Sequence, residues 1–191
     1  MNEGLARMNE KYTKGAVVLH WLVAIGILLN LWIGLRFDYT PEDKIRAAID
    51  FHKSVGITVL GLTLLRLLWR AVHVPPAIPT TYQVWERKLS HFVHWLLYGM
   101  IVAVPLSGWL YDSAWKDAPS HPMSLFGVIP WFRLPIVSGL SVAQKDHWHD
   151  LLGGLHTAMA YVLLAAVALH ILGALKHQFL DKHRELQRMW F

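Results

Sequence analysis

The stretch LLGGLHTAMAYVLLAAVALHILGAL, residues 151–175, decides the fold. It carries no charged residue over a length that crosses the hydrocarbon layer of a bilayer when helical. Within it His156 and His170 are fourteen residues apart, almost a whole number of helical turns. Both imidazoles are therefore expected on one helix face, about 21 Å apart along the axis. Since bilayer hydrocarbon is about 30 Å thick, one histidine falls toward each surface, and each needs a partner.

The composition of the whole chain is that of a polytopic membrane protein. Of its 191 residues 54% are hydrophobic and only 16% charged, and the apolar residues form long blocks. The sequence contains no cysteine, which excludes disulfides, thiolate-ligated iron-sulfur clusters and covalently attached c-type haem. Any metal centre must therefore be held by histidine. The net charge of +5 does not indicate a nucleic-acid partner, because the cations are scattered at the ends of apolar blocks.

Four transmembrane helices are predicted, and together they form a single all-α domain over residues 1–191. Their expected ranges are 16–35, 51–70, 89–111 and 151–175. The first of these lacks a cleavage pattern and is interpreted as a retained helix. The connection 112–150 is rich in Pro, Trp and Ser and too long for a tight turn. It is expected to form a structured extracytoplasmic loop that carries specificity or serves as a packing lid.

The distribution of cations predicts the orientation of the chain. Eleven of the eighteen lysines and arginines fall on the side of the two termini and the second connection. The positive-inside rule then places both termini in the cytoplasm, which agrees with an even number of spans.

Two further histidines complement the pair on the fourth helix. His20 lies about one turn inside the cytoplasmic end of the first helix, at the depth expected for His170. His52 lies at the extracytoplasmic start of the second helix, close to the depth of His156. This pattern predicts a membrane four-helix bundle with two bis-histidine haem b sites stacked across the bilayer. A single membrane histidine is as often a structural hydrogen bonder, but four at matched depths favour ligands.

Several segments then carry a family resemblance. They are LHW (19–21), FHKSVG (51–56), LLRLLWR (64–70), HFVHWLLY (91–98) and LKHQFLDK (175–182). In order, over nearly the whole chain, they resemble the prokaryotic cytochrome b561 family. The resemblance implies a four-helix protein of the bacterial inner membrane that binds two haem b groups and exchanges electrons with the quinone pool. Carrying its iron ligands onto the matching positions gives His20 with His170 and His52 with His156.

Three more residues are candidate cofactor-binding groups. Arg66 lies near the membrane boundary, where it could pair with a haem propionate or merely snorkel. His94, which with His91 begins the third helix, could bond a propionate or a quinone, or be an ordinary interfacial histidine. His177 is a candidate quinone contact and proton source, because imidazole titrates near neutral pH, although a polar residue there also fixes topology.

The leading functional hypothesis is electron transfer between an extracytoplasmic donor and the quinone pool. The resemblance allows this to be an enzyme, an oxidoreductase that takes electrons from superoxide and reduces ubiquinone; a periplasmic electron-transfer protein is the other candidate donor. A haem-bearing membrane anchor subunit of a partner oxidoreductase is the alternative. A non-redox metal carrier or structural bundle is the third interpretation, and it predicts no visible chromophore. Membrane lipid is expected as the surrounding partner and nucleic acid is not.

Overall fold

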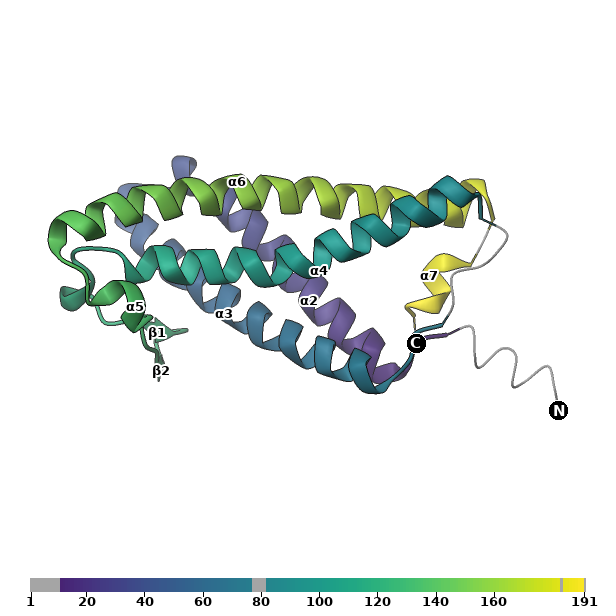
Figure 1. Cartoon of the computed structure of the whole chain (residues 1–191), viewed down its shortest axis with the longest axis horizontal. Helices are drawn as coiled ribbons and strands as arrows, with labels where there is room; N and C mark the ends of the chain where they lie inside the picture. The colour runs from purple at the N-terminus through teal and green to yellow at the C-terminus, as the bar shows by residue number, and fades with distance from the viewer. Residues whose placement is uncertain (1–10, 77–81, 183, 191) are drawn as a thin grey trace.

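Four long helices form an elongated bundle in the computed structural model, which describes residues 11–76, 82–182 and 184–190 (Figure 1). The long helices are α2 (Lys14–Leu35), α3 (Glu42–Val72), α4 (Val84–Ser113) and α6 (Val142–Leu175). Both termini lie at one end of the bundle, called the terminal end here (Figure 1). The segment between α4 and α6 lies at the other end, called the loop end. Arg7, which contributed to the predicted orientation, falls outside the described residues.

Short elements fill the connections. A 3₁₀ turn η1 (Phe37–Tyr39) joins α2 to α3. The loop-end segment contains a 3₁₀ turn η2 (Ala118–Ser120), strands β1 (Ser124–Leu125) and β2 (Ile129–Pro130), and the one-turn helix α5 (Pro135–Ser138). The strands pair antiparallel, with Leu125 opposite Ile129. After α6 the chain continues through a π-helical turn η3 (Lys176–Leu180) and ends in α7 (Glu185–Arg188).

Each of the four long helices begins before the start of the span predicted for it, and α3 and α6 do so by nine residues. Helix α3 begins at Glu42 rather than near 51, because Pro41 precedes it and Glu42 and Asp43 carry negative charge into its first turn. Helix α6 begins at Val142 rather than near 151, because Ser141 and Gln144 form a capping box. The expected loop 112–150 is therefore shorter, and its last part is helical.

The helices pack in two pairs, α2 along α3 and α4 along α6, and α3 and α4 join the pairs. Their shared core includes Val23, Val59 and Val104, all less than a tenth exposed. Gly26 sets the closeness of α2 and α3, since a Cβ there would lie 2.6 Å from the Val59 side chain. Helix α4 continues through Pro105 without interruption.

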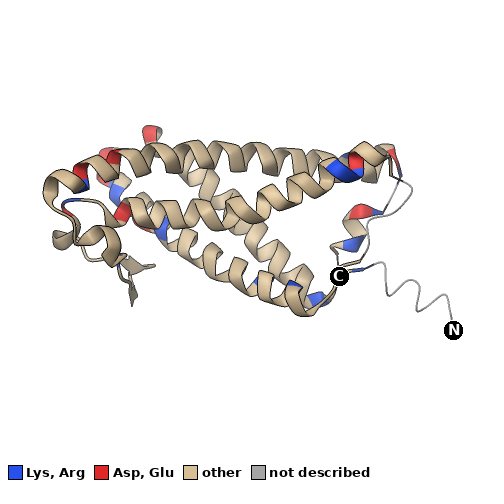
Figure 2. Cartoon of the chain, in the orientation of Figure 1, with Lys and Arg blue, Asp and Glu red and all other residues tan. Residues whose placement is uncertain are grey.

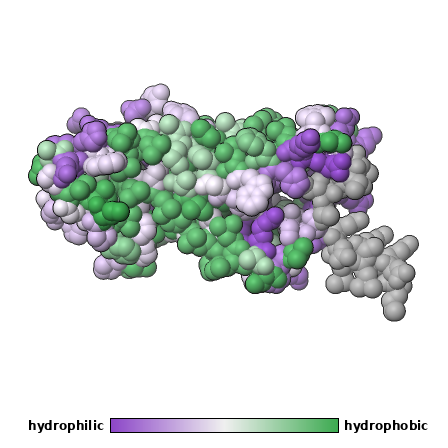
Figure 3. All heavy atoms as spheres, in the orientation of Figure 1, coloured by the Kyte–Doolittle hydropathy of each residue, from purple (hydrophilic) through white to green (hydrophobic). Residues whose placement is uncertain are grey.

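The outward surface of the bundle is apolar between two charged ends. Charged residues gather at the loop end and the terminal end and are sparse between them (Figure 2). Hydrophobic residues cover much of the middle of the visible face (Figure 3). Over the bundle as a whole, each long helix exposes large hydrophobic side chains, such as Trp32, Leu68, Trp95 and Leu172. All four long helices are apolar and long enough to cross a membrane, so this surface is suited to contact lipid.

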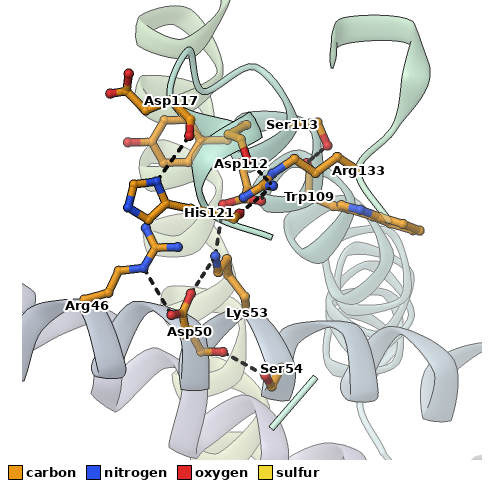
Figure 4. A network of polar contacts seen from close by, with 12 residues as sticks. Arg46, Asp50, Lys53, Ser54, Trp109, Asp112, Ser113, Asp117, His121 and Arg133 are labelled. Carbon is orange, nitrogen blue, oxygen red and sulfur yellow. Dashed lines mark hydrogen bonds and ion pairs between the residues drawn. The ribbon is translucent and has the colours of Figure 1, made fainter. Parts of the chain in front are cut away.

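A network of ion pairs fastens the loop-end segment onto the bundle (Figure 4). Asp112, at the end of α4, accepts from Lys53 Nζ at 3.1 Å and from Arg133 Nε at 2.9 Å. All three side chains are only 11% exposed. Lys53 also contacts Asp50 at 2.8 Å, and Asp50 pairs with Arg46 at 3.1 Å. The result is a continuous chain of charges that joins α3, α4 and the segment before α5.

Hydrogen bonds complete this attachment. Arg133 Nη1 donates to the carbonyl oxygens of Ala118 and His121, at 3.0 and 2.8 Å. The Ser54 hydroxyl, on α3, accepts from the amide of Phe126 at 2.9 Å. The loop end is thus held as a defined cap above the helices.

We expect Asp112→Asn to destabilise the protein by about 3 kcal/mol, because it leaves two largely buried cations without their shared carboxylate. This corresponds to a fall in melting temperature of roughly 6–12 °C, measured by thermal unfolding in detergent. Asp146→Asn is the matched control, since Asp146 pairs with Lys116 where both side chains are about half exposed. It should cost less than about 1 kcal/mol. Equal melting temperatures for the two variants would contradict a structural role of Asp112.

Candidate functional site

The loop end of the bundle holds one of the predicted histidine pairs. His52 on α3 and His156 on α6 face each other with ring centroids 6.1 Å apart and ring planes at 90°. The ring of Phe37 lies 5.2 Å from that of His52 and covers it from the α2–α3 connection. Residues over a hundred positions apart in the chain are therefore brought together at the loop end.

The orientation of His156 is fixed by α4. Its Nδ1 lies 3.1 Å from the carbonyl oxygen of Val104 and 3.0 Å from the hydroxyl of Ser107. The Ser107 hydroxyl itself donates to Val104 O at 2.8 Å, so its oxygen remains an acceptor. These neighbours require a proton on Nδ1, which leaves the lone pair on Nε2 free to bind a metal. Histidine ligands of metals are usually oriented by such a bond to the other nitrogen.

His52 lacks this support. Its Nδ1 is buried and, among the described residues, has no hydrogen-bond partner. Gly34 on α2 lies beside the ring, since a Cβ there would be 3.4 Å from His52 Cε1. Without such a bond, the ring of His52 is held by packing against Phe37 and Gly34.

Three histidines meet at the terminal end. His20 on α2 and His170 on α6 have ring centroids 6.2 Å apart with planes at 70°. His94 on α4 lies 5.3 Å from His170, and its Nδ1 is 3.3 Å from the hydroxyl of Ser90. The sequence pointed to His94 as a propionate or quinone contact but did not foresee that it would adjoin the second ring pair.

Arg66 lies beside this cluster in a small cavity of about 50 Å³. The cavity is lined by α2, α3 and α4 together with the chain just before α2, and Tyr12, Trp69 and Tyr98 are among its walls. Arg66 Nη1 is buried and has no partner among the described residues. Arg70, one turn along α3, places its guanidinium 5.2 Å from the ring centroid of Tyr98. An unsatisfied guanidinium next to two imidazoles suits an acidic group such as a propionate.

His177 lies apart from the cluster in a network of its own. Its Nδ1 contacts Asp181 at 2.7 Å, and its ring stacks on Tyr82 with centroids 4.2 Å apart. Lys176 lies between Glu86 and Asp181, at 2.6 and 2.7 Å. Glu86, His177 and Asp181 could by spacing hold a metal ion, but the Lys176 ammonium already neutralises the two carboxylates. This network ties the chain after α6 to the start of α4.

The ring separations provide a test of whether a haem fits. Metal–imidazole bonds are about 2 Å long, so two nitrogens on opposite sides of one metal are about 4 Å apart. The ring centroids of such a pair then lie about 6 Å apart, and the observed values are 6.1 and 6.2 Å. The residues present therefore fit bis-histidine coordination at both ends.

The comparisons with known proteins agree with this geometry. The family model for prokaryotic cytochrome b561 matches residues 11–191. The chain belongs to the prokaryotic cytochrome b561 family. Its members are membrane b-type cytochromes that take part in electron transfer and bind b-type haem.

Three curated relatives align over almost their whole length. "Cytochrome b561 homolog 2" of Escherichia coli is 32% identical over 94% of this chain and 91% of the relative. "Cytochrome b562" of Cereibacter sphaeroides is 28% identical over 93% and 94%. "Probable superoxide oxidase CybB" of Yersinia pestis is 25% identical over 95% and 97%. The chain therefore spans more than nine tenths of the length of each of these relatives.

Sequence reasoning missed the groups that orient the rings in this cytochrome. Val104, Ser107 and Gly108 all fall in the predicted span 89–111, and none of them was expected to contact a histidine. In the structure a Cβ at Gly108 would lie 2.9 Å from His156 Cε1, so a side chain at this position would displace the His156 ring. A small polar residue followed by glycine in a membrane helix is a signal that a neighbouring side chain approaches closely.

Gly108→Ala is expected to push the His156 ring away from Val104 and to lower haem occupancy at the loop end several-fold. Haem content per chain, measured by pyridine haemochrome, checks this. Gly99→Ala on the same helix is the control, because a Cβ there meets nothing within 4 Å. Unchanged haem content in both variants would show that haem binding does not depend on the close contact between Gly108 and His156.

The contacts of Asp181 with Lys176 and His177 should be lost at low pH. The hydrogen bond from Lys176, together with that from His177, holds the pKa of Asp181 below its usual range. The contacts are therefore present above the pKa of the unfolded carboxyl and are lost as the pH falls through the lowered pKa of the folded one. We expect hydrogen exchange in residues 176–182, corrected for intrinsic rates, to accelerate below about pH 4. In Asp181→Asn that exchange should already be fast at pH 7.

Proposed function

We propose that the protein carries two haem b groups and transfers electrons across the bacterial inner membrane between an extracytoplasmic donor and the quinone pool. One observation carries the proposal. Two histidine pairs with the ring separation of bis-imidazole coordination lie at opposite ends of one four-helix bundle. In this proposal the loop end faces the periplasm and the terminal end the cytoplasm, as the positive-inside rule predicts.

Each histidine has a specific part in this proposal. His52 and His156 would hold the haem iron at the loop end, and His20 and His170 would hold that at the terminal end. When bound, haem b supplies a one-electron carrier at each position. The chain itself supplies ligation, the spacing set by fourteen residues of α6, and a dry apolar surrounding. His156 is held by Val104 and Ser107, so its Nε2 is directed before any ligand binds.

Arg66 and His94 support the cofactor at the terminal end. The unpaired Nη1 of Arg66 is placed to pair with a propionate, which would remove the cost of its burial. His94 adjoins His170 and can donate to a propionate or to a quinone carbonyl. The cavity that contains Arg66 and Tyr12 opens beside them and offers further hydrogen-bond donors to a quinone headgroup.

His177 is a weaker quinone contact than the sequence implied, because its imidazole is already engaged. Asp181 accepts from Nδ1 and Tyr82 covers the ring. We therefore assign His177 to proton supply near the membrane surface rather than to direct quinone binding. Reduction of a quinone takes up two protons, and an imidazole hydrogen-bonded to a carboxylate can relay protons toward it.

The proposed reaction oxidises superoxide at the loop end. Two superoxide anions, one ubiquinone and two protons yield two molecules of oxygen and one ubiquinol. Similarity to the Yersinia pestis protein named as a superoxide oxidase supports this donor.

Haem counting tests the ligand assignment. Purified protein should show two haem b per chain in reduced-minus-oxidised and pyridine haemochrome spectra. His156→Ala and His170→Ala should each retain one haem, whereas the control His147→Ala, outside both pairs, should retain two. Retention of both haems in either ligand variant, or a protein without haem, would contradict the proposal.

Turnover distinguishes the donor. Superoxide added to the two-haem protein should drive catalytic reduction of a short-chain ubiquinone, and His52→Ala should abolish it by more than 100-fold while the terminal-end haem remains. Two haems without turnover would reject superoxide as donor and would favour the anchor-subunit function instead.

A further inference from the structure

A second cavity lies in the loop-end cap, away from both histidine pairs. Its volume is about 270 Å³. The lining comes from η2, from the chain on either side of the β hairpin, from α5 and from the first turn of α6, and it includes Pro119, Met123, Trp131, Arg133, Ser138 and Lys145. None of these residues has a part in the proposed electron transfer.

Lys145 is the most unusual of these residues. The residue as a whole is 9% exposed, and none of the described residues forms an ion pair with its ammonium group, which keeps some contact with solvent. Lysine is rarely buried unless it is paired. By contrast Lys116, on the same cap, is half exposed and paired with Asp146. The Lys145 side chain borders the cavity, so a group inside the cavity can supply the missing counter-charge.

Two neighbouring donors are also incomplete. Arg133 uses Nε on Asp112 and Nη1 on two carbonyl oxygens, but its Nη2 is buried with no partner among the described residues. The indole Nε1 of Trp131 is likewise buried and unpartnered. Buried N–H groups without acceptors are uncommon in native structures. Two buried donors without acceptors, with the Lys145 ammonium beside them, indicate that an acceptor belongs in this cavity.

The charge balance specifies what kind of acceptor. The lining of the cavity contains two cations, Arg133 and Lys145, and no carboxylate. Asp112 already pairs with Arg133, so the lining has one positive charge in excess. The remaining walls, from Pro119, Met123 and the Trp131 ring, are apolar. At about 30 Å³ per water, the cavity has room for about nine water-sized groups.

We propose that this cavity binds a small organic acid through its carboxylate. The carboxylate lies between the Lys145 ammonium and the free N–H groups of Arg133 and Trp131, and the Ser138 hydroxyl is a further donor. The apolar part of the molecule lies against Pro119, Met123 and the indole ring. A bound carboxylate offsets the excess charge and satisfies the donors that the cap leaves without acceptors.

Benzoate is a suitable probe because it joins one carboxylate to a flat apolar ring. Binding to the haem-loaded protein in detergent is measured by calorimetry at constant ionic strength, with chloride as the competing salt. We expect saturable binding of one benzoate per chain. Lys145→Met, which keeps the length of the buried stem, should weaken binding at least tenfold, and Trp131→Phe should weaken it about threefold. Lys116→Met, the same charge change at an exposed site of the cap, should leave binding unchanged.

Several outcomes would overturn the proposal. Absence of saturable binding would do so, and so would equal weakening by Lys116→Met, which would reduce the effect to general charge attraction. Binding of inorganic phosphate or of phosphatidylglycerol nanodiscs, but not of benzoate, would identify a phosphate site instead. Loss of a haem in Lys145→Met would assign the cavity to a propionate. The haem spectrum of each variant separates these results from any failure of the proposed electron transfer.

Discussion

The structure depends on the cost of placing imidazoles in an apolar layer. Four histidines lie within long apolar helices, where a lone polar side chain is expensive. The bundle brings them together in two pairs, with ring centroids 6.1 and 6.2 Å apart. The two histidines of a pair are about one hundred residues apart in the sequence at the loop end and about one hundred and fifty at the terminal end. A direct imidazole–imidazole bond would draw the rings closer. The separation instead suits a metal ion between the two rings. A cofactor bound there would also be the partner that each buried imidazole needs.

The two ring pairs are held by different means, and the difference follows from the elements around them. At the loop end α4 orients His156 through Val104 and Ser107, and the buried charges of Lys53, Asp112 and Arg133 fix the cap above. At the terminal end no such cap exists among the described residues. Trp21 there donates to the carbonyl of Met189 at 2.8 Å, so the chain after α6 folds back onto α2 and covers the inner pair. The loop end is a rigid polar lid, whereas the terminal end is closed by short helical turns and aromatic contacts.

Much of this arrangement could be predicted from the sequence because it depends on periodicity. The uncharged run 151–175 fixed the spacing of His156 and His170, and apolar blocks with flanking cations fixed the number of spans. The start of α3 could not be found by hydropathy, because residues 42–50 are polar and helical only through their N-terminal charges and their packing against the cap. The contact of His94 with His170 and the bond from His156 to Val104 depend on the rotation of α4 relative to α6. That rotation is set by many small side-chain contacts, and no local pattern encodes it.

The distribution of unsatisfied groups gives the strongest physical reason to expect ligands at definite places. Three of the buried polar atoms without partners in the described chain fall at sites discussed above: Arg66 Nη1 beside the inner pair, and Arg133 Nη2 with Trp131 Nε1 at the cap cavity. A stable chain rarely leaves such atoms unpaired at random. An acidic group bound at either place would remove the cost of their burial. In the proposed function a haem propionate is that group beside Arg66, so haem binding should stabilise the fold of this protein.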